Sequence, residues 1–326
     1  MNKLILTLII FLTVSACEFN IKLPPENKTQ AKSYLAEDSI LYNYPQQVSK
    51  NVWSAIGATA APTYENSGHN NNLSFIITKE GVVVVNAGAS YLLAKALHEE
   101  IKKITKQAVK YVILENAQGH AMLGSNYWQE QGAKVVAHKD AAAVMKKFAK
   151  ASVERMQARQ KEKGKFTKAT MPDITFDDKY EIRLGDTIIQ ALHLGPAHSP
   201  GDIVVWLPQQ KLVISGDMAF HQRLLPVTEH TDTAAWINTW ETKFEPLGAQ
   251  IVIPGHGTPT TMAEVRKYTV DYLKYVRAQV AKILENDGDL QQAYEMDLSA
   301  YEHLHTFSDL AKQNIGRIYR AMEFDF

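Results

Sequence analysis

The chain has 326 residues, of which 45% are apolar and 21% charged, a composition typical of a globular protein with one large core. Lysine and arginine together number 35, as do aspartate and glutamate, so the balanced charge excludes an overall field that would attract nucleic acid. The single cysteine, Cys17, excludes an intramolecular disulfide and a cysteine-based zinc site, which leaves histidine, carboxylate and weaker oxygen donors as metal ligands.

The N-terminal 17 residues have the pattern of an export signal. An early lysine is followed by an apolar run from Leu4 to Val14, too short for a convincing membrane span, and by small residues before Cys17. Residues 14–17 resemble the lipobox of bacterial lipoproteins, whose cysteine carries the lipid; an incidental cysteine in an ordinary signal peptide is the alternative. We therefore expect an exported lipoprotein on the periplasmic face of a bacterial membrane, preferentially the outer membrane, anchored through Cys17.

The remaining chain is expected to form a tether and one domain. Residues 18–45 are polar and carry three prolines, which is typical of a linker between a membrane and a folded domain. The domain is expected over residues 46–326. Its first clear elements are two β-branched strands at 73–77 and 82–85, which form a hairpin around the turn at 79–81.

Helices and further strands follow along the chain. Ser90 is expected to cap a helix whose apolar stripe consists of Leu93, Leu97, Ile101 and Ile104. A long polar helix is predicted at 139–163, and the C-terminal region is predicted to be helical from about Met262. Further strands are predicted at 111–114, 134–138, 187–194, 202–207, 211–215 and 250–253. Two runs of strands, each with helices after it, predict an α/β fold of two packed sheets with helices outside.

Four polar loops follow or join these strands, where a rigid scaffold commonly places functional groups. They cover residues 115–124, 195–202, 215–218 and 254–257. Their metal-binding side chains are His120, His198, Asp217 and His256. Each loop taken singly is also explained by helix capping, turn hydrogen bonds or surface exposure.

The order and spacing of these loops resemble the metallo-β-lactamase superfamily. The matching motifs are Gly-Val-Val-Val-Val at 81–85, Leu-Gly-Ser-Asn-Tyr at 123–127, Gly-Pro-Ala-His-Ser-Pro-Gly-Asp at 195–202, Val-Ile-Ser-Gly-Asp at 213–217 and Pro-Gly-His-Gly at 254–257. The resemblance runs from about residue 50 to the C-terminus and is nearest to the periplasmic branch called quinoprotein-relay zinc metallohydrolases. It implies a four-layer αββα domain, with two mixed sheets face to face between helices, and a zinc-dependent hydrolase.

The resemblance also implies metal ligands, several of which are replaced here. The positions that match the family's H-x-H-x-D-H motif are Asn116, Gln118, His120 and Ala121. Two histidines have thus become carboxamides, the aspartate a histidine and the final histidine an alanine. The aspartate that ends the preceding strand in the family is Asn86 here, whereas His198, Asp217 and His256 match the remaining ligands.

The two metal sites that the family implies are affected differently. The first would consist of His198, Asp217 and the two carboxamides of the altered motif, which are poor zinc ligands beside imidazole, so we expect it to be weak or empty. The second would consist of His120, Asp217 and His256 with a water in the open position, the ligand count of a catalytic mononuclear zinc. We expect one Zn²⁺, with Asp217 and His120 catalytic.

Two functions are compatible with this ligand set. In the first, a single Zn²⁺ activates water and polarises a small-molecule substrate, which gives hydrolysis of an ester, amide, thioester or lactam. In the alternative, the chain is a non-catalytic, membrane-tethered binding protein that keeps the fold without a working metal site. The altered motif supports the alternative, and the three retained ligands support the enzyme.

Other polar residues have simpler explanations. His221 and Arg223 follow Asp217 closely enough to line a cleft, and pairing of Arg223 with an anionic substrate is an alternative to a purely structural role. His69 is expected in a solvent-exposed loop. The basic helix between Lys146 and Lys168 is expected to present a solvated face, because no aromatic residues alternate with its charges as they do at nucleic-acid-binding surfaces.

Overall fold

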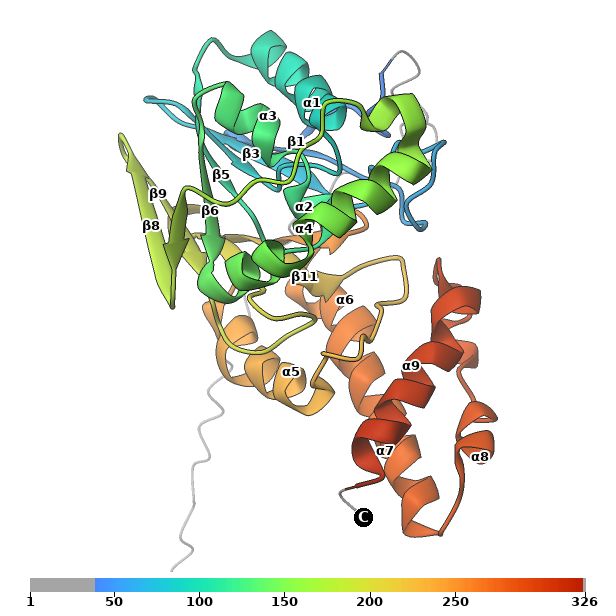
Figure 1. Cartoon of the computed structure of the whole chain (residues 1–326). Coiled ribbons are helices and arrows are strands. Elements are labelled where there is room, and N and C mark those ends of the chain that lie inside the picture. The colour runs from blue at the N-terminus through green and yellow to red at the C-terminus, as the bar shows by residue number, and fades with distance from the viewer. Residues whose placement is uncertain (1–38, 325–326) are drawn as a thin grey trace, which may run out of the picture. The chain divides into compact units, whose positions relative to one another are not determined.

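The computed structural model describes residues 39–324. The predicted signal peptide, Cys17 and most of the predicted tether lie outside the described residues. Among the helices of residues 39–324, none is long and apolar enough to cross a membrane. The described part consists of two β-sheets and the helices packed against them, which is the predicted α/β arrangement (Figure 1).

The first sheet has seven strands in the order β1-β2-β3-β4-β5-β6-β7. Strands β1 to β4 pair antiparallel, and the predicted hairpin is confirmed by the pairing of Ile77 with Val82. From β4 to β7 the pairing is parallel, and helical crossovers make each step. The strands are β1 (Gln46–Ser49), β2 (Val52–Ala55), β3 (Leu73–Ile77), β4 (Val82–Val85), β5 (Val109–Ile113), β6 (Lys134–His138) and β7 (Ile174–Phe176).

Helices of the first half of the chain cover the outer face of this sheet. They are α1 (Tyr91–Ile104), α2 (Gly119–Met122), α3 (Ser125–Glu130) and α4 (Lys139–Gln160), which continues into the 3₁₀ turn η2 (Lys161–Gly164). As predicted, the hydroxyl of Ser90 caps α1 by accepting the N–H of Leu93. The apolar stripe of α1 packs on the sheet as far as Ile101, but Ile104 is exposed.

The second sheet has five strands in the order β12-β11-β10-β9-β8. Its strands pair antiparallel except for β11 and β12, which are parallel neighbours. The strands are β8 (Lys179–Leu184), β9 (Thr187–Leu192), β10 (Val204–Leu207), β11 (Leu212–Phe220) and β12 (Ile251–His256). Strands β11 and β12 continue past their predicted ends, so Asp217 and His256 belong to strands and not to the loops predicted at 215–218 and 254–257.

The C-terminal helices cover the outer face of the second sheet, as predicted. The α-helices are α5 (Thr233–Thr239), α6 (Met262–Arg266), α7 (Tyr272–Glu285), α8 (Leu290–Tyr294) and α9 (Phe307–Met322). Helices α5 and α6 continue into π-helical turns, η4 (Trp240–Phe244) and η6 (Lys267–Asp271). Short 3₁₀ turns are η3 (Pro208–Gln210), η5 (Glu245–Leu247) and η7 (Ser299–Tyr301).

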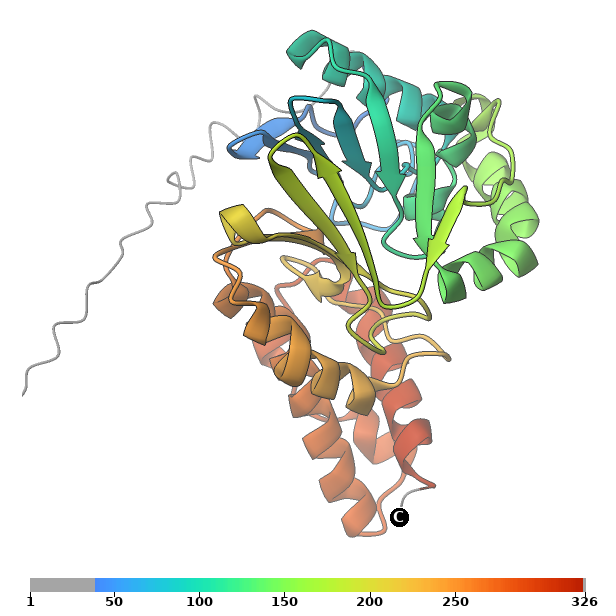
Figure 2. The same cartoon turned by 90° about the vertical axis from the view of Figure 1, so that its left-hand side faces the viewer.

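The apolar core lies in three layers that follow from this arrangement. Between the sheets, β-branched and other aliphatic residues such as Val83, Ile113 and Ile214 are fully or almost fully buried. Strands buried on both faces read as continuous apolar runs, which explains the Val82–Val85 segment. Figure 2 shows the teal and green helices outside one sheet and the orange and red helices outside the other.

Candidate metal centre

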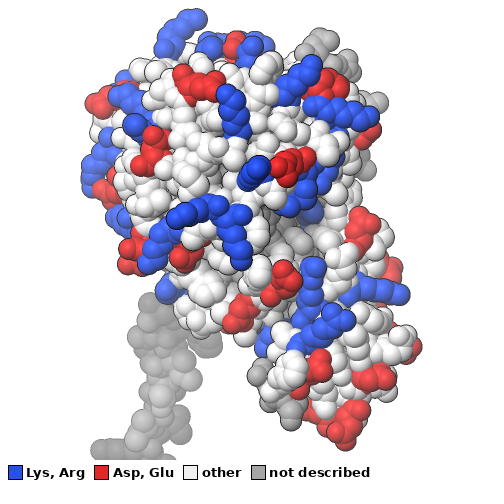
Figure 3. Space-filling view, in the orientation of Figure 1, with Lys and Arg blue, Asp and Glu red and all other residues white. Residues whose placement is uncertain are grey.

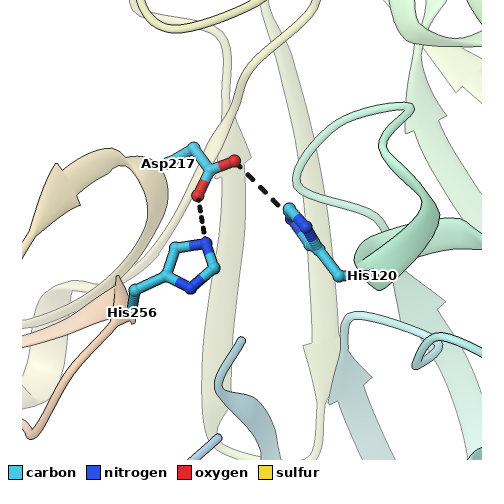
Figure 4. A group of neighbouring side chains, drawn as sticks. All are labelled: His120, Asp217 and His256. Carbon is cyan, nitrogen blue, oxygen red and sulfur yellow. Dashed lines mark ion pairs between the residues drawn. The ribbon is translucent and has the colours of Figure 1, made fainter. Parts of the chain in front are cut away.

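Three side chains from distant parts of the sequence come together at the strand ends: His120, Asp217 and His256. The carboxylate of Asp217 lies between the two imidazole rings (Figure 4). Its Oδ1 is 3.2 Å from Nε2 of His256, and its Oδ2 is 3.5 Å from Nε2 of His120. One atom from each of the three residues lies within 4.8 Å of the others, so they form a group that could hold a metal ion.

Asp217 reaches this position because two glycines leave space for close approach. Gly216 has a φ of +53°, and a Cβ there would lie 1.9 Å from Oε2 of Glu115. On the neighbouring strand, a Cβ at Gly255 would lie 2.7 Å from Oδ1 of Asp217 itself. Both glycines are therefore required by the packing around the carboxylate, and Gly216 also by its left-handed backbone.

His120 lies in α2 and is oriented by Glu115, two residues after the end of β5. Its Nε2–H donates to Oε1 of Glu115 at 3.0 Å. The loop itself is fixed by Asn86, whose Oδ1 accepts the backbone N–H of Glu115 at 3.1 Å. Asn86 thus orients this loop although it is not the aspartate found in the family. Burial, followed by the charge of Asp217, raises the pKa of Glu115.

His256 has two alternative partners at Nδ1, and they require different tautomers. Nδ1 can donate to the backbone carbonyl of Asn70, which leaves a lone pair on Nε2 for a metal. Alternatively, Nδ1 can accept from Nη1 of Arg223, 3.1 Å away, with the proton on Nε2 facing Asp217. Burial and the nearby charge of Arg223 lower the pKa of His256 to about 4, so the ring is neutral near neutral pH.

The residues expected to form the first metal site make hydrogen bonds with one another. Nδ2 of Asn116 donates to Oδ1 of Asp202 and Oδ2 of Asp217, both at 3.1 Å, and its Oδ1 accepts the backbone N–H of Gln118. The amide of Gln118 donates to Nε2 of His198 at 2.7 Å. Nε2 of His198 is 3.9 Å from Asp217, so His198 lies beside the group of three and not within it.

Arg223, His221 and His69 differ in their burial and in their contacts. Arg223 is buried and contacts His256. Nδ1 of His221 lies 2.8 Å from the carbonyl oxygen of Thr258, and His221 does not line the cavity beside the three-residue group. His69 is fully buried, where we predicted a solvent-exposed loop: its Nδ1 accepts the N–H of Tyr42, and its Nε2 lies 3.2 Å from the carbonyl of Ala55.

A cavity of about 280 Å³ opens onto the group of His120, Asp217 and His256, the candidate metal ligands. His120, Asp217 and His256 all line it, together with Gln118 and Arg223. A ligand bound in this cavity would therefore contact all three candidate metal ligands.

Comparisons with known proteins agree with this geometry. The sequence profile described as the metallo-β-lactamase superfamily matches residues 120–256. A metallo-β-lactamase type 2 from Bacillus sp. (strain 170) is 24% identical over 216 residues, covering 65% of this chain and 75% of its own. The structure of a metallo-β-lactamase from Pontibacter korlensis superposes with a TM-score of 0.59 at 22% identity, covering 71% of this chain and 98% of its own.

The chain belongs to the metallo-β-lactamase superfamily. Another relative, a linear primary-alkylsulfatase from Pseudomonas sp. (strain ATCC 19151), is 27% identical over 165 residues, covering 46% of this chain and 31% of its own. The predicted family and its αββα fold are thus confirmed.

The side chains of His120, Asp217 and His256 fit a zinc ion. Ligands about 2.0–2.2 Å from a tetrahedral zinc lie roughly 3.3–3.6 Å from one another, close to the separations of Asp217 from the two histidines. Burial alone would raise the pKa of Asp217, but the charge of His120 and the polar contact with His256 keep it well below its usual range, so the carboxylate is ionised. Two imidazoles and one carboxylate are a common donor set of catalytic zinc in this chemistry.

Sequence reasoning missed two buried carboxyl groups next to this centre. Glu115 holds His120, and Asp202 accepts hydrogen bonds from Asn116 and from the backbone and hydroxyl of Ser199. Burial, with a contribution from Asp217, raises the pKa of Asp202 to about 8. Glu115 begins the polar segment 115–124, and Asp202 ends the segment 195–202. The sequence indicates them only as acidic residues that lie within two positions of a buried strand.

Proposed function

We propose that this protein is a hydrolase that uses a single Zn²⁺ held by His120, Asp217 and His256. The observation that carries the proposal is the convergence of these three donor groups, from α2, β11 and β12, at separations suited to one tetrahedral ion. Membership of a superfamily whose relatives here are hydrolases supports the same reaction class.

The chain's own residues supply positioning for this chemistry. When bound, zinc lowers the pKa of water towards neutrality and polarises the oxygen of an ester, amide, thioester or lactam group. In the zinc-free protein, Glu115 holds the ring of His120 by accepting a hydrogen bond from Nε2–H, a proton that zinc would displace. The carbonyl of Asn70 selects the His256 tautomer with a free Nε2. Asn116 orients the carboxylate of Asp217 by donating a hydrogen bond to its Oδ2.

The altered motif favours the binding of one zinc ion and not two. The amides of Asn116 and Gln118 are used in hydrogen bonds to Asp202, Asp217 and His198. Carboxamides are also weak zinc ligands compared with imidazole. We therefore propose that His198 positions Gln118 at the cavity wall and does not hold a second ion.

Metal content and stability test this proposal directly. We expect close to one zinc per purified full-length chain, and a melting temperature that falls when zinc is removed and recovers when it is added back. His256→Ala should abolish both effects, whereas His303→Ala, which removes an exposed histidine, should leave them unchanged. A panel of chromogenic esters, thioesters, amides and lactams, assayed with and without zinc, should identify the hydrolysed bond.

A specific observation favours a second function, that of a non-catalytic binding protein. Both polar atoms of the Asn116 side chain and the amide nitrogen of Gln118 bond to neighbours without any ion, as expected of a cleft that is stable in the absence of metal. A melting temperature that ignores zinc in both the native chain and His256→Ala would support this function and reject the enzyme. Two tightly bound ions per chain would instead reject the single-ion site.

We further propose that the protein is exported and anchored by a lipid on Cys17. The support is the signal-like pattern of residues 1–17 and the lipobox resemblance at 14–17. Labelling cells with a radioactive fatty acid should mark the native protein but not Cys17→Ser. Cell fractionation should place the native protein with the membranes, and an unlabelled native protein would reject the anchor.

A further inference from the structure

The cavity at the metal-binding group has a strongly basic wall. Three arginines line it, Arg155, Arg159 and Arg223, whereas Asp217 is the one carboxylate in its lining. Arg155 and Arg159 are four residues apart in α4, so they lie on the same face of that helix. The basic helix that we expected to be only a solvated surface therefore also forms part of the cavity wall.

Arg223 lies at the buried end of this basic wall. Its residue is 6% exposed, and its Nη1 contacts His256. Its Nε–H has no hydrogen-bond partner among residues 39–324. A buried donor without a partner costs free energy, and an arginine facing a cavity commonly satisfies that donor with an oxyanion.

The two arginines of α4 are available for a ligand. Nη2 of Arg155 donates to the hydroxyl of Ser152 at 3.0 Å, and Ser152 also lines the cavity. Within residues 39–324, no carboxylate forms an ion pair with Arg155, Arg159 or Arg223. Figure 3 shows basic side chains gathered over the region that α4 occupies in Figure 1.

We propose that Arg155 and Arg159, with Arg223 at greater depth, form a subsite for the oxyanion group of a small ligand: a carboxylate, sulfate or phosphate. Arginine presents two parallel N–H groups that match such anions. The rest of the ligand would pack on the apolar part of the lining, which includes Pro62, Leu123 and Met156. This inference rests on the proposed function: the substrates of the hydrolase would be small organic anions.

Binding of simple anions to zinc-free protein tests the subsite separately from the hydrolase. The full-length chain is freed of metal on a chelating resin and titrated with acetate, inorganic sulfate and inorganic phosphate, with calorimetry and melting temperature as readouts. We expect at least one of the three anions to bind, and the preferred one identifies the anionic group. Arg155→Gln/Arg159→Gln should weaken that binding about tenfold, because two charge-assisted contacts are lost.

A matched pair on the same helix provides the control. Lys146 and Lys150 are also four residues apart and exposed, but they do not line the cavity. Lys146→Gln/Lys150→Gln removes the same charge and should change the dissociation constant less than twofold. Arg155→Lys/Arg159→Lys, which keeps the charge but not the planar guanidinium, should restore part of the affinity.

The outcomes separate this proposal from the hydrolase. If Arg155→Gln/Arg159→Gln and Lys146→Gln/Lys150→Gln weaken anion binding equally, the effect is a general electrostatic one and the subsite is overturned. The absence of anion binding to the native chain would also overturn it. Anion binding that depends on the arginine pair, in a protein without zinc-dependent hydrolysis, would keep the subsite and reject the enzyme.

Discussion

His120 and Glu115 form a buried pair in which Nε2 of the histidine donates to Oε1 of the glutamate at 3.0 Å. The same nitrogen lies 3.5 Å from Oδ2 of Asp217. Burial by itself lowers the pKa of His120, but the two carboxylates outweigh this effect and raise it. The nitrogen that a metal needs as a free lone pair therefore keeps its proton to higher pH than an ordinary histidine, and zinc must displace that proton.

Zinc affinity should consequently rise with pH across the titration of His120. Glu115→Gln removes one of the carboxylates that raise the pKa, so the rise in affinity should move to lower pH. Zinc dissociation constants, measured against a competing chelator from about pH 6 to about pH 8.5, check this shift. Glu302→Gln, on the exposed surface, is the control, and superimposable curves for Glu115→Gln and the native chain would contradict the role given to Glu115.

Gly255 is expected to be as important for the metal site as the ligands beside it. In Gly255→Ala, the new methyl would lie 2.7 Å from Oδ1 of Asp217 and from the backbone of Gly216. We expect the free energy of unfolding to fall by about 2 kcal/mol or more and zinc binding to be lost, because moving the backbone of Gly216 away from the new methyl costs free energy. Gly132→Ala is the control, since nothing lies within 4 Å of its Cβ and only its φ of +86° is strained, at about 1–2 kcal/mol. Equal losses in the two variants, measured by urea unfolding, would show that crowding at Asp217 is unimportant.

The parts of the fold that were predicted correctly are those with strong periodicity. The hairpin of Leu73–Ile77 and Val82–Val85 and the capped helix after Ser90 depend on local patterns, and the structure has them. Strand β8 (Lys179–Leu184) was missed because it mixes charged with apolar residues at a sheet edge. The strand ends at Asp217 and His256 were placed too early, because glycines there indicate turns until the neighbouring strand is known.

The convergence of His120, Asp217 and His256 could be predicted because these residues are carried by motifs with a fixed order in the family. The positions of Glu115 and Arg155 could not, because each depends on what another part of the chain places opposite it. Helical periodicity puts Arg155 and Arg159 on one face, but only the fold shows that a cavity lies against that face. His69 was predicted as exposed because nothing local indicates that its loop is covered.

His69 makes stability depend on pH in a defined direction. Burial lowers the pKa of His69 to about 4, whereas an unfolded histidine titrates near 6.5. Between these values the unfolded chain binds a proton that the folded chain does not, so stability falls as pH is lowered from about 6.5 to about 4. The full effect of this one residue is roughly 3 kcal/mol.

Urea unfolding at a series of pH values between 7.5 and 4.5 measures this loss. His69→Gln cannot titrate, so its free energy of unfolding should be lower near neutral pH but should fall less steeply on acidification. His303→Gln, which removes an exposed histidine, should keep the native slope. A native slope in His69→Gln would assign the acid sensitivity to other groups.

Restoring the two lost imidazoles should convert the proposed single-ion site into a two-ion site. Asn116→His/Gln118→His places histidines at the first two motif positions beside His198, so the bound zinc should increase from about one to about two ions per chain. The same change removes the amide that donates to Asp202 and Asp217, so the zinc-free variant should lose about 1–3 kcal/mol of stability. Zinc should recover more than this loss, because both ions bind the folded state alone.

Metal analysis together with melting temperatures checks both parts. A variant that still binds one ion would show that the first site has lost its geometry as well as its ligands, since His198 would then be too far from Asp217 to share an ion with it.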